Sequence, residues 1–280
     1  MEKSKVWFIT GASSGIGLEI SKSALASGYK VVATGRDTDK VSNAIGASSD
    51  NLLVVKMDVS NPKEIETAVK SAVDKFGTID VLVNNAGNFY AGFFEELSQR
   101  EIELQFAITL FGPMNVTRIV LPIMRKNRKG HVITISSTAG FSGNVYCSAY
   151  AASKFGVEGW MEALAMEVAT FGIKTTIVEP GFFRTNLLEP SSTKWSAEFI
   201  EDYAEANAQL RPMWKGLSGT QGGDPAKLAD ALIKIVNENE PPKRWLAGED
   251  AIAQAEAKVS EFQKQINAYR ELSSSLAFLN

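Results

Sequence analysis

A glycine-rich turn between an apolar run and a helical pattern constrains the fold of this chain more than any other feature. The turn covers residues 10–17, after the apolar residues 6–9 and before the helical pattern of residues 18–25. Glycines permit a tight turn and let a ligand approach the backbone without a Cβ in the way. The start of a helix adds unpaired N–H groups and a partial positive charge. The pattern predicts a pyrophosphate site at a strand–helix junction, with a plain turn as the alternative.

Apolar runs rich in β-branched residues alternate with helical patterns along the rest of the chain. With 280 residues, 45% of them hydrophobic and 22% charged, the chain can bury one large core. The alternation predicts one α/β domain over residues 1–280, with a doubly wound, Rossmann-type parallel sheet of about seven strands and helices on both faces. We expect the strands at residues 5–10, 30–35, 51–56, 79–84, 131–136, 173–179 and 243–247.

A second motif, Tyr-Ala-Ala-Ser-Lys at residues 150–154, begins a helical segment that continues to about Phe171. Tyr150 and Lys154 are four residues apart, so their side chains project from one helix face. Ser137 lies thirteen residues upstream of Tyr150, just after the apolar run 131–135. A serine that leaves a strand and a tyrosine that enters the next helix can meet at the carboxyl edge of a parallel sheet, where open α/β folds bind ligands.

With these residues the chain resembles the short-chain dehydrogenase/reductase family, over roughly residues 5–248. The shared motifs occur in the family's order: residues 10–17, 84–87, Ser137, 150–154 and 180–181. The resemblance implies an NADP-dependent oxidoreductase, either a ketone or aldehyde reductase or a secondary-alcohol dehydrogenase.

Hydride transfer to a carbonyl creates an alkoxide, so the site needs a proton donor and a group that polarises the oxygen. We expect Tyr150 to donate the proton and Ser137 to hold the substrate oxygen. We expect the nearby ammonium of Lys154 to lower the pKa of Tyr150, and the resemblance implies that Lys154 also binds the nicotinamide ribose. Ser137, Tyr150 and Lys154 form the predicted catalytic group.

The end of the second predicted strand indicates the cofactor. It carries Gly35 and Arg36, where an NAD-binding chain would have an Asp or Glu for the ribose 2′-hydroxyl. Gly35 leaves space and the Arg36 guanidinium suits a phosphate, so the sequence predicts NADP(H). Asp37 and Asp39 are alternative ribose partners, but their position past the strand favours capping of the next helix.

The resemblance assigns further cofactor contacts. It implies that Asp58 and Val59 lie beside the adenine, that Thr185 meets the carboxamide, and that residues 84–87 lie under the nicotinamide half. For Asn84, a purely structural role at the strand end is an equally weighted alternative. The predicted cofactor-binding residues are Gly11, Ser13, Ser14, Gly15, Ile16, Gly17, Arg36, Asp58, Val59, Asn84, Ala86, Gly87, Tyr150, Lys154, Pro180, Gly181, Phe183 and Thr185.

Thr109 departs from the family pattern. Alignment of residues 106–113 puts it where the family has an asparagine that completes the catalytic set. Threonine can bond back to a carbonyl one turn earlier and bend the helix. The substitution leaves room for a rival function, a low-turnover dinucleotide-binding sensor or scaffold, and epimerisation or dehydration on the same fold is a third reading.

The net charge, the apolar runs and the single cysteine and histidine limit the partners and sites that the chain can have. A net charge of −3 offers no basic surface for nucleic acid. No apolar run approaches the roughly 18–20 residues of a membrane span, and residues 1–5 leave no room for a signal peptide, so we expect a cytoplasmic protein without a membrane partner. Cys147 is the only cysteine and His131 the only histidine. A disulfide, a cysteine-built metal site and a histidine triad are therefore excluded, no metal is predicted, and structural roles are favoured for both residues.

Two segments depart from the alternating pattern. Residues 182–224 hold many aromatic and glycine residues and are expected to form a substrate lid. Aromatic residues near the motifs suggest an apolar pocket for a hydrophobic carbonyl or alcohol: Phe89, Tyr90, Phe141, Tyr146, Phe182, Phe183 and Leu187.

The C-terminal extension, residues 249–280, reads as a charged amphipathic helix over residues 249–272. We expect it to pack on the domain or on a subunit partner; a coiled-coil dimerisation helix is less favoured because the stretch holds only about three heptads. The resemblance implies a homodimer or homotetramer formed by the helices at about 98–127 and 149–171.

Overall fold

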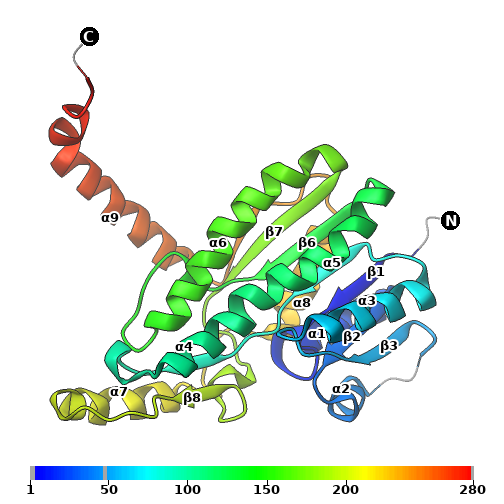
Figure 1. The fold of residues 1–280 in the computed structure, drawn as a ribbon, viewed down its shortest axis with the longest axis horizontal. Helices are drawn as coiled ribbons and strands as arrows, with labels where there is room; N and C mark the ends of the chain where they lie inside the picture. The colour runs from blue at the N-terminus through cyan, green and yellow to red at the C-terminus, as the bar shows by residue number, and fades with distance from the viewer. Residues whose placement is uncertain (1–3, 47–48, 279–280) are drawn as a thin grey trace.

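A single parallel sheet of seven strands forms the centre of the molecule (Figure 1). The computed structural model describes residues 4–46 and 49–278. The sheet confirms the predicted Rossmann-type α/β fold. In spatial order its strands are β3 (Leu52–Lys56), β2 (Lys30–Gly35), β1 (Val6–Ile9), β4 (Val81–Asn84), β6 (Gly130–Ile135), β7 (Ile173–Pro180) and β9 (Arg244–Ala247).

The strand order reverses between β1 and β4. From β1 the chain builds outward through β2 and β3, then crosses back to β4 and builds the other half of the sheet. Ile9 is in register with Ala33 of β2 and with Val83 of β4. The loops that follow these strands therefore meet at one crevice, which is the position where doubly wound sheets bind ligands.

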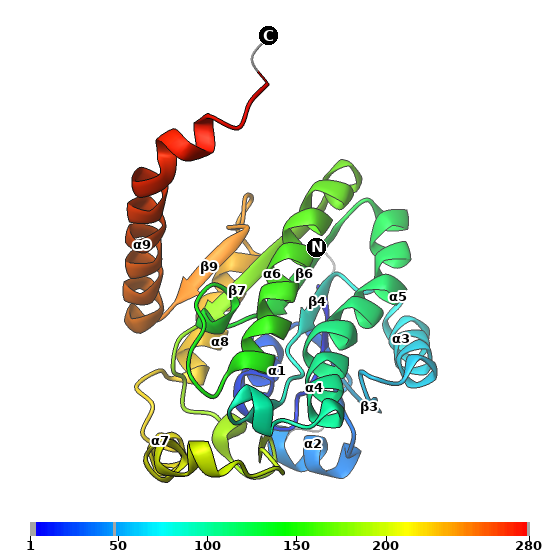
Figure 2. The ribbon, with the colours of Figure 1, turned by 60° about the vertical axis from the view of Figure 1, so that its left-hand side comes forward.

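Two helical layers cover the sheet (Figures 1 and 2). Successive side chains of a strand point to opposite faces, and in β1 Phe8 joins one core cluster while Trp7 and Ile9 join the other. One layer consists of α3 (Pro62–Phe76), α5 (Gly112–Asn127) and α6 (Ser148–Val168), and the other of α1 (Gly15–Ala26), α2 (Thr38–Ile45) and α8 (Pro225–Val236).

Asp37 caps α2, as the sequence predicts. Its Oδ1 accepts a hydrogen bond from the Lys40 N–H at 3.0 Å, which satisfies one open donor at the helix start. Asp39 follows in the first turn of the same helix, where a carboxylate suits the helix dipole.

The predicted helix at 98–127 is interrupted. It consists of α4 (Gln99–Phe106), a π-helical segment (Ala107–Phe111) and α5. By length and composition alone the stretch Gln99–Asn127 could cross a membrane, so the expectation that no apolar run approaches that length was wrong. Val116, Val120 and Met124 of this stretch are buried in the core, and a core helix passes the same test.

Residues 182–224 form a small layer at the carboxyl end of the sheet (Figure 2). The three-residue strands β5 (Phe89–Ala91) and β8 (Thr193–Trp195) pair in parallel, and α7 (Ala204–Gly216) follows. Short 3-10 turns complete the layer at Phe94–Glu96, Asn186–Leu188 and Glu201–Tyr203.

The last helix, α9 (Glu249–Ser274), leaves the body of the molecule (Figures 1 and 2). Ala251 is the one buried residue of α9. The expected packing of this helix on the domain is therefore limited to its beginning.

Candidate active site

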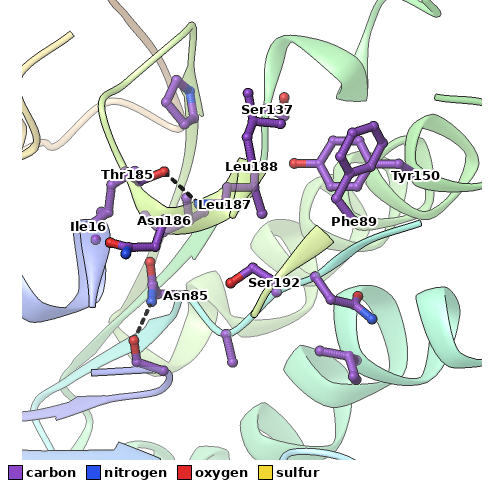
Figure 3. A pocket seen from close by; sticks show the side chains of 18 of the residues that line it. Ile16, Asn85, Phe89, Ser137, Tyr150, Thr185, Asn186, Leu187, Leu188 and Ser192 are labelled. Carbon is purple, nitrogen blue, oxygen red and sulfur yellow. Dashed lines mark hydrogen bonds between the residues drawn. The ribbon is translucent and has the colours of Figure 1, made fainter. Parts of the chain in front are cut away.

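The glycine turn forms one wall of the crevice. Gly11 and Gly15 have φ angles of 69° and 58°, which L side chains rarely adopt. A Cβ on Gly17 would lie 2.3 Å from Asn85 Nδ2, so no larger residue fits there without a shift. Asn85 holds the turn, because its Nδ2 donates to the carbonyl oxygens of Thr10 at 2.9 Å and Gly11 at 3.1 Å (Figure 3). The sequence motif contained Asn85 but did not indicate this role.

The start of α1 is open to the crevice. Its N-cap residue Ser14 makes no capping hydrogen bond through its side chain, and the first turn contains no acidic residue. The first N–H groups and the positive end of the helix dipole are therefore free to bind an anion. Ser13, Ser14 and Gly15 line the crevice. This cradle fits the pyrophosphate of a dinucleotide.

The crevice continues into a cleft of about 530 Å³. All predicted site residues line it except Gly17 and Asn84. Asn84 is buried at the end of β4, and its Nδ2 donates to the hydroxyls of Thr117 at 2.9 Å and Thr134 at 3.3 Å. These contacts support the structural alternative for Asn84.

Arg36, Asp58 and Val59 lie together at one end of the cleft. Arg36 has an exposed side chain at the end of β2, whereas Gly35 before it is buried. A Cβ on Gly35 would lie 2.7 Å from Val41 Cγ2, so no larger residue fits there without a shift. Neither Asp37 nor Asp39 lines the cleft. A cation therefore occupies the strand end where a ribose-binding carboxylate would lie.

The predicted catalytic group meets at the opposite end. Ser137 precedes a 3-10 turn (Thr138–Gly140), and its Oγ accepts a hydrogen bond from the Ala139 N–H at 3.1 Å. Tyr150 is in the first turn of α6, and Figure 3 shows its hydroxyl turned toward Ser137. Lys154 lies one turn further on, with Nζ 5.6 Å from the centre of the Tyr150 ring. This Nζ donates to the Ile135 carbonyl at 2.8 Å.

Apolar side chains surround the space beside Tyr150. The Phe89 ring packs edge-on against the Tyr150 ring at 5.2 Å and lies 5.6 Å from the Trp214 ring. Of the aromatic residues predicted for the pocket, Phe141 and Tyr146 do not line the cleft. Tyr146 instead donates its hydroxyl hydrogen to Asn207 Oδ1, in the small layer formed by residues 182–224. The apolar residues that line this end are Phe89, Phe182, Leu187, Leu188 and Trp214.

A family model described as short chain dehydrogenase matches residues 5–195. The chain belongs to this family. A 3-ketodihydrosphingosine reductase from Bacteroides thetaiotaomicron is 38% identical over 245 residues, which cover 87% of this chain and 88% of the relative.

Two solved structures extend the comparison. A short-chain dehydrogenase from Streptomyces avermitilis is 36% identical with a TM-score of 0.90, and the match covers 99% of this chain and 100% of the other, so it extends over α9. A 3-ketoacyl-(acyl-carrier-protein) reductase from Brucella melitensis, solved with NADH, is 25% identical with a TM-score of 0.73, over 88% of this chain and 96% of the other.

Burial dominates the pKa values of Tyr150 and Lys154 in this short-chain dehydrogenase. It raises the pKa of Tyr150 above the usual 10.0, and hydrogen bonding with Ser137 offsets part of the rise. Burial also lowers the pKa of Lys154 from 10.5 to about 8, against the opposing effect of the Glu158 carboxylate. Burial outweighs the other effects on Tyr150, so its pKa is raised, and the lowering expected from Lys154 is not seen in this structure.

Thr109 lies in the π-helical segment and is buried. Its Oγ1 accepts a hydrogen bond from Gln105 Nε2 at 2.7 Å and donates to Asn88 Oδ1 at 3.1 Å. The prediction that the Thr109 hydroxyl bonds back to a carbonyl one turn earlier was therefore wrong. The helix over residues 99–127 is irregular because of its π-helical segment. Gln105 also accepts the Tyr90 N–H at 2.9 Å, so this network fastens the start of β5 to the helix.

Cys147 and His131, the single cysteine and the single histidine, are both buried. Cys147 lines the cleft, but burial raises the pKa of its thiol to about 12, which disfavours the reactive thiolate. Burial lowers the pKa of His131 to about 3, and its Nε2 pairs with Thr176 Oγ1 at 2.8 Å. These surroundings support the structural roles favoured for both residues.

Proposed function

We propose that this protein is an NADP(H)-dependent carbonyl reductase that acts on an apolar ketone or aldehyde, or on the corresponding secondary alcohol in reverse. The observation that carries the proposal is one cleft with two chemically distinct ends. Ser137, Tyr150 and Lys154 lie at one end, and Arg36 lies at the other, with the open start of α1 between them in the same cleft.

The bound dinucleotide would supply or accept the hydride. The N–H groups at the start of α1 would bind its pyrophosphate, and Lys154 would bind its ribose, as the family resemblance implies. Ser137 would donate a hydrogen bond to the substrate oxygen and hold it beside the Tyr150 hydroxyl. Tyr150 would then give its proton to that oxygen; a phenol whose pKa is 10.0 or higher is protonated at neutral pH.

The apolar end of the cleft supports a hydrophobic substrate. Phe89, Leu187 and Trp214 offer contact surface rather than charged partners. The related reductase from Bacteroides thetaiotaomicron is named for a 3-keto lipid, and we propose a long-chain or similarly apolar carbonyl compound for this chain.

Arg36→Ala tests the cofactor preference. A charge-assisted hydrogen bond contributes roughly 1.5–3 kcal/mol, so we expect the wild type to bind NADPH roughly tenfold to a hundredfold more tightly than NADH. The variant should lose most of this preference, whereas Arg100→Ala, a change at an exposed arginine outside the cleft, should keep it. Fluorescence titration with both cofactors measures the ratio, and equal affinities in the wild type would overturn the NADP(H) assignment.

Turnover measurements distinguish the proposed reductase from a low-turnover sensor or scaffold and from an epimerase or dehydratase. Thr109 is the feature that favours a low-turnover sensor or scaffold. We expect NADPH oxidation with a panel of apolar ketones; tight NADPH binding without turnover on any of them would favour the sensor, and product formation without net NADPH oxidation would indicate epimerisation or dehydration.

We also propose that the protein forms a homo-oligomer and is located in the cytoplasm. The faces expected to pair carry exposed apolar side chains, Phe111 beside α5 and Phe155 and Met166 on α6. Sedimentation of the purified protein measures the subunit number, and fractionation of the native cell tests the location.

A further inference from the structure

Exposed apolar side chains on α9 repeat every seven residues. Ile252, Val259 and Ile266 form one such series, and Ala255, which is partly buried, forms a second with Phe262 and Tyr269, offset by three. Leu276, two residues after the end of α9, continues the second spacing. These are the spacings of the a and d positions of a coiled-coil seam. The side chains of Val259, Phe262 and Tyr269 are 68%, 54% and 64% exposed. The described residues of the chain therefore leave this seam uncovered.

The beginning of α9 is fixed to the body, and the remainder is a free arm. Ala251 is buried, and the Asp250 carboxylate accepts the Phe182 N–H at 2.7 Å. Lys258 is the last partly buried residue, and every described residue after it in α9 is exposed. A 26-residue helix is about 39 Å long, so more than half of this length projects into solvent (Figures 1 and 2).

We propose that α9 pairs in antiparallel orientation with the α9 of a second copy of this chain. The register that aligns both series places the two-fold axis at the level of Lys264. Phe262 of each copy then packs against Ile266 of the other, and Val259 against Tyr269. Further out, Ala255 meets Ser273, and Ile252 lies at the level of Leu276, just past the end of the partner helix. Large side chains thus face large ones and small side chains face small ones in every layer.

The flanking charges agree with the same register. The positions on one side of the seam are Glu256, Gln263 and Arg270. In the antiparallel pair Glu256 of each copy faces Arg270 of the other, and the two Gln263 side chains face each other across the axis. In a parallel pair these three positions would face Ala251, Lys258 and Gln265, and no pair of opposite charges would form. On the other side Lys258 already pairs with Glu261 of its own helix at 2.9 Å.

Charge also argues against a membrane surface as the partner of this seam. Helices that lie on anionic membranes carry mainly lysine and arginine on their polar face. In α9 five acidic residues outnumber three basic ones: Glu249, Asp250, Glu256, Glu261 and Glu271 against Lys258, Lys264 and Arg270. A second copy satisfies both the seam and its flanking charges.

Cysteine cross-linking tests the register. We expect Gln263→Cys to form a covalent dimer under mild oxidation, because the two copies of this position face each other. Lys264→Cys, on the outer side of the helix, should give no more dimer than the wild type, whose single Cys147 is buried. Equal cross-linking of the two variants, or none at position 263, would overturn the proposed pairing even if the protein proves oligomeric through other faces.

Charge reversal tests the same pairing without a covalent bond. We expect Glu256→Arg and Arg270→Glu each to weaken α9-dependent association about tenfold, since each turns two attractive pairs into repulsive ones. The double variant restores opposite charges and should return to within about threefold of the wild type. Sedimentation at low salt measures the association, and failure of the double variant to recover would contradict the register. Sedimentation needs no turnover, so this test does not depend on the proposed reaction. Where NADPH oxidation is measurable, it should stay within about twofold in all variants.

Discussion

At the scale of single residues, burial decides the chemistry of the proposed active site. Burial raises the pKa of the Tyr150 phenol, so the group is protonated at neutral pH and is a weaker acid than a free phenol. Ser137 offsets part of that rise and lies where it can orient a substrate oxygen. The hydrogen bond from Lys154 Nζ to the Ile135 carbonyl fixes the position of the ammonium, 5.6 Å from the centre of the Tyr150 ring.

Tyr150→Phe separates binding from chemistry. The change removes one hydroxyl and keeps the ring against Phe89, so NADPH affinity should be almost unchanged. Turnover should fall about 10²-fold or more, the usual contribution of a general acid. Tyr146→Phe is the matched control, because its hydroxyl bonds Asn207 outside the cleft, and it should keep at least a tenth of wild-type turnover. If Tyr150→Phe keeps as much, another group donates the proton.

At the scale of elements, the π-helical segment replaces a regular helix beside the cleft. Ile108 of this segment lines the cleft, whereas Thr109 points into a buried network with Gln105 and Asn88. Asn88 itself lines the cleft. The network therefore connects the helix to the loop that carries residues 85–88, and Thr109 acts through position rather than through contact with ligands.

Thr109→Asn tests that role. Asparagine can also accept from Gln105 and donate to Asn88, so we expect turnover to change by no more than about tenfold in either direction, roughly 1.4 kcal/mol of barrier. Thr109→Val is the contrasting variant, because it keeps the shape but removes the shortest hydrogen bond of the Gln105 amide and leaves only its longer bonds to Asn88. Steady-state kinetics on one ketone measure both. An inactive wild type rescued more than a hundredfold by Thr109→Asn would instead favour the sensor.

The same scale shows what sequence patterns can predict. The seven strands of the main sheet could be predicted because each is a short, largely apolar run between helical patterns. Ser137, Tyr150 and Lys154 were predicted as a group because their order and spacing are specific. The strands β5 and β8 have three residues each, too few for a periodic pattern. The role of Asn85 and the Gln105–Asn88 network depend on contacts between distant segments, and spacing along the chain contains no signal for them.

At the scale of the whole molecule, one ionic cluster joins an outer strand of the sheet to α6. Arg244 of β9 pairs with Glu158 at 2.9 Å, with Glu162 at 2.7 Å, and with Glu179 of β7. Glu179 is fully buried and Glu158 nearly so. Three carboxylates share one guanidinium, so the cluster holds more negative charge than it can neutralise. Burial, followed by the charge of Glu158, raises the pKa of Glu179 from 4.5 to about 7.

The raised pKa of Glu179 makes folding stability depend on pH. Below pH 4.5 this carboxyl is neutral in both the folded and the unfolded chain. Between pH 4.5 and 7 the unfolded chain ionises it freely, whereas the folded protein resists, so its contribution to the free energy of unfolding falls as the pH rises through about 7. A shift in pKa from 4.5 to about 7 corresponds to a loss of at most roughly 3.4 kcal/mol.

Glu179→Gln removes this dependence, because glutamine stays neutral at every pH. We expect the free energy of unfolding of the wild type to fall relative to that of the variant as the pH rises from 5 to 8. Glu162→Gln is the matched control: Glu162 contacts the same arginine but is 63% exposed, so its replacement should leave the wild-type slope in place. Urea denaturation at several pH values measures the three curves. Parallel curves for the wild type and Glu179→Gln would show that Arg244 keeps Glu179 ionised in the folded protein throughout this range.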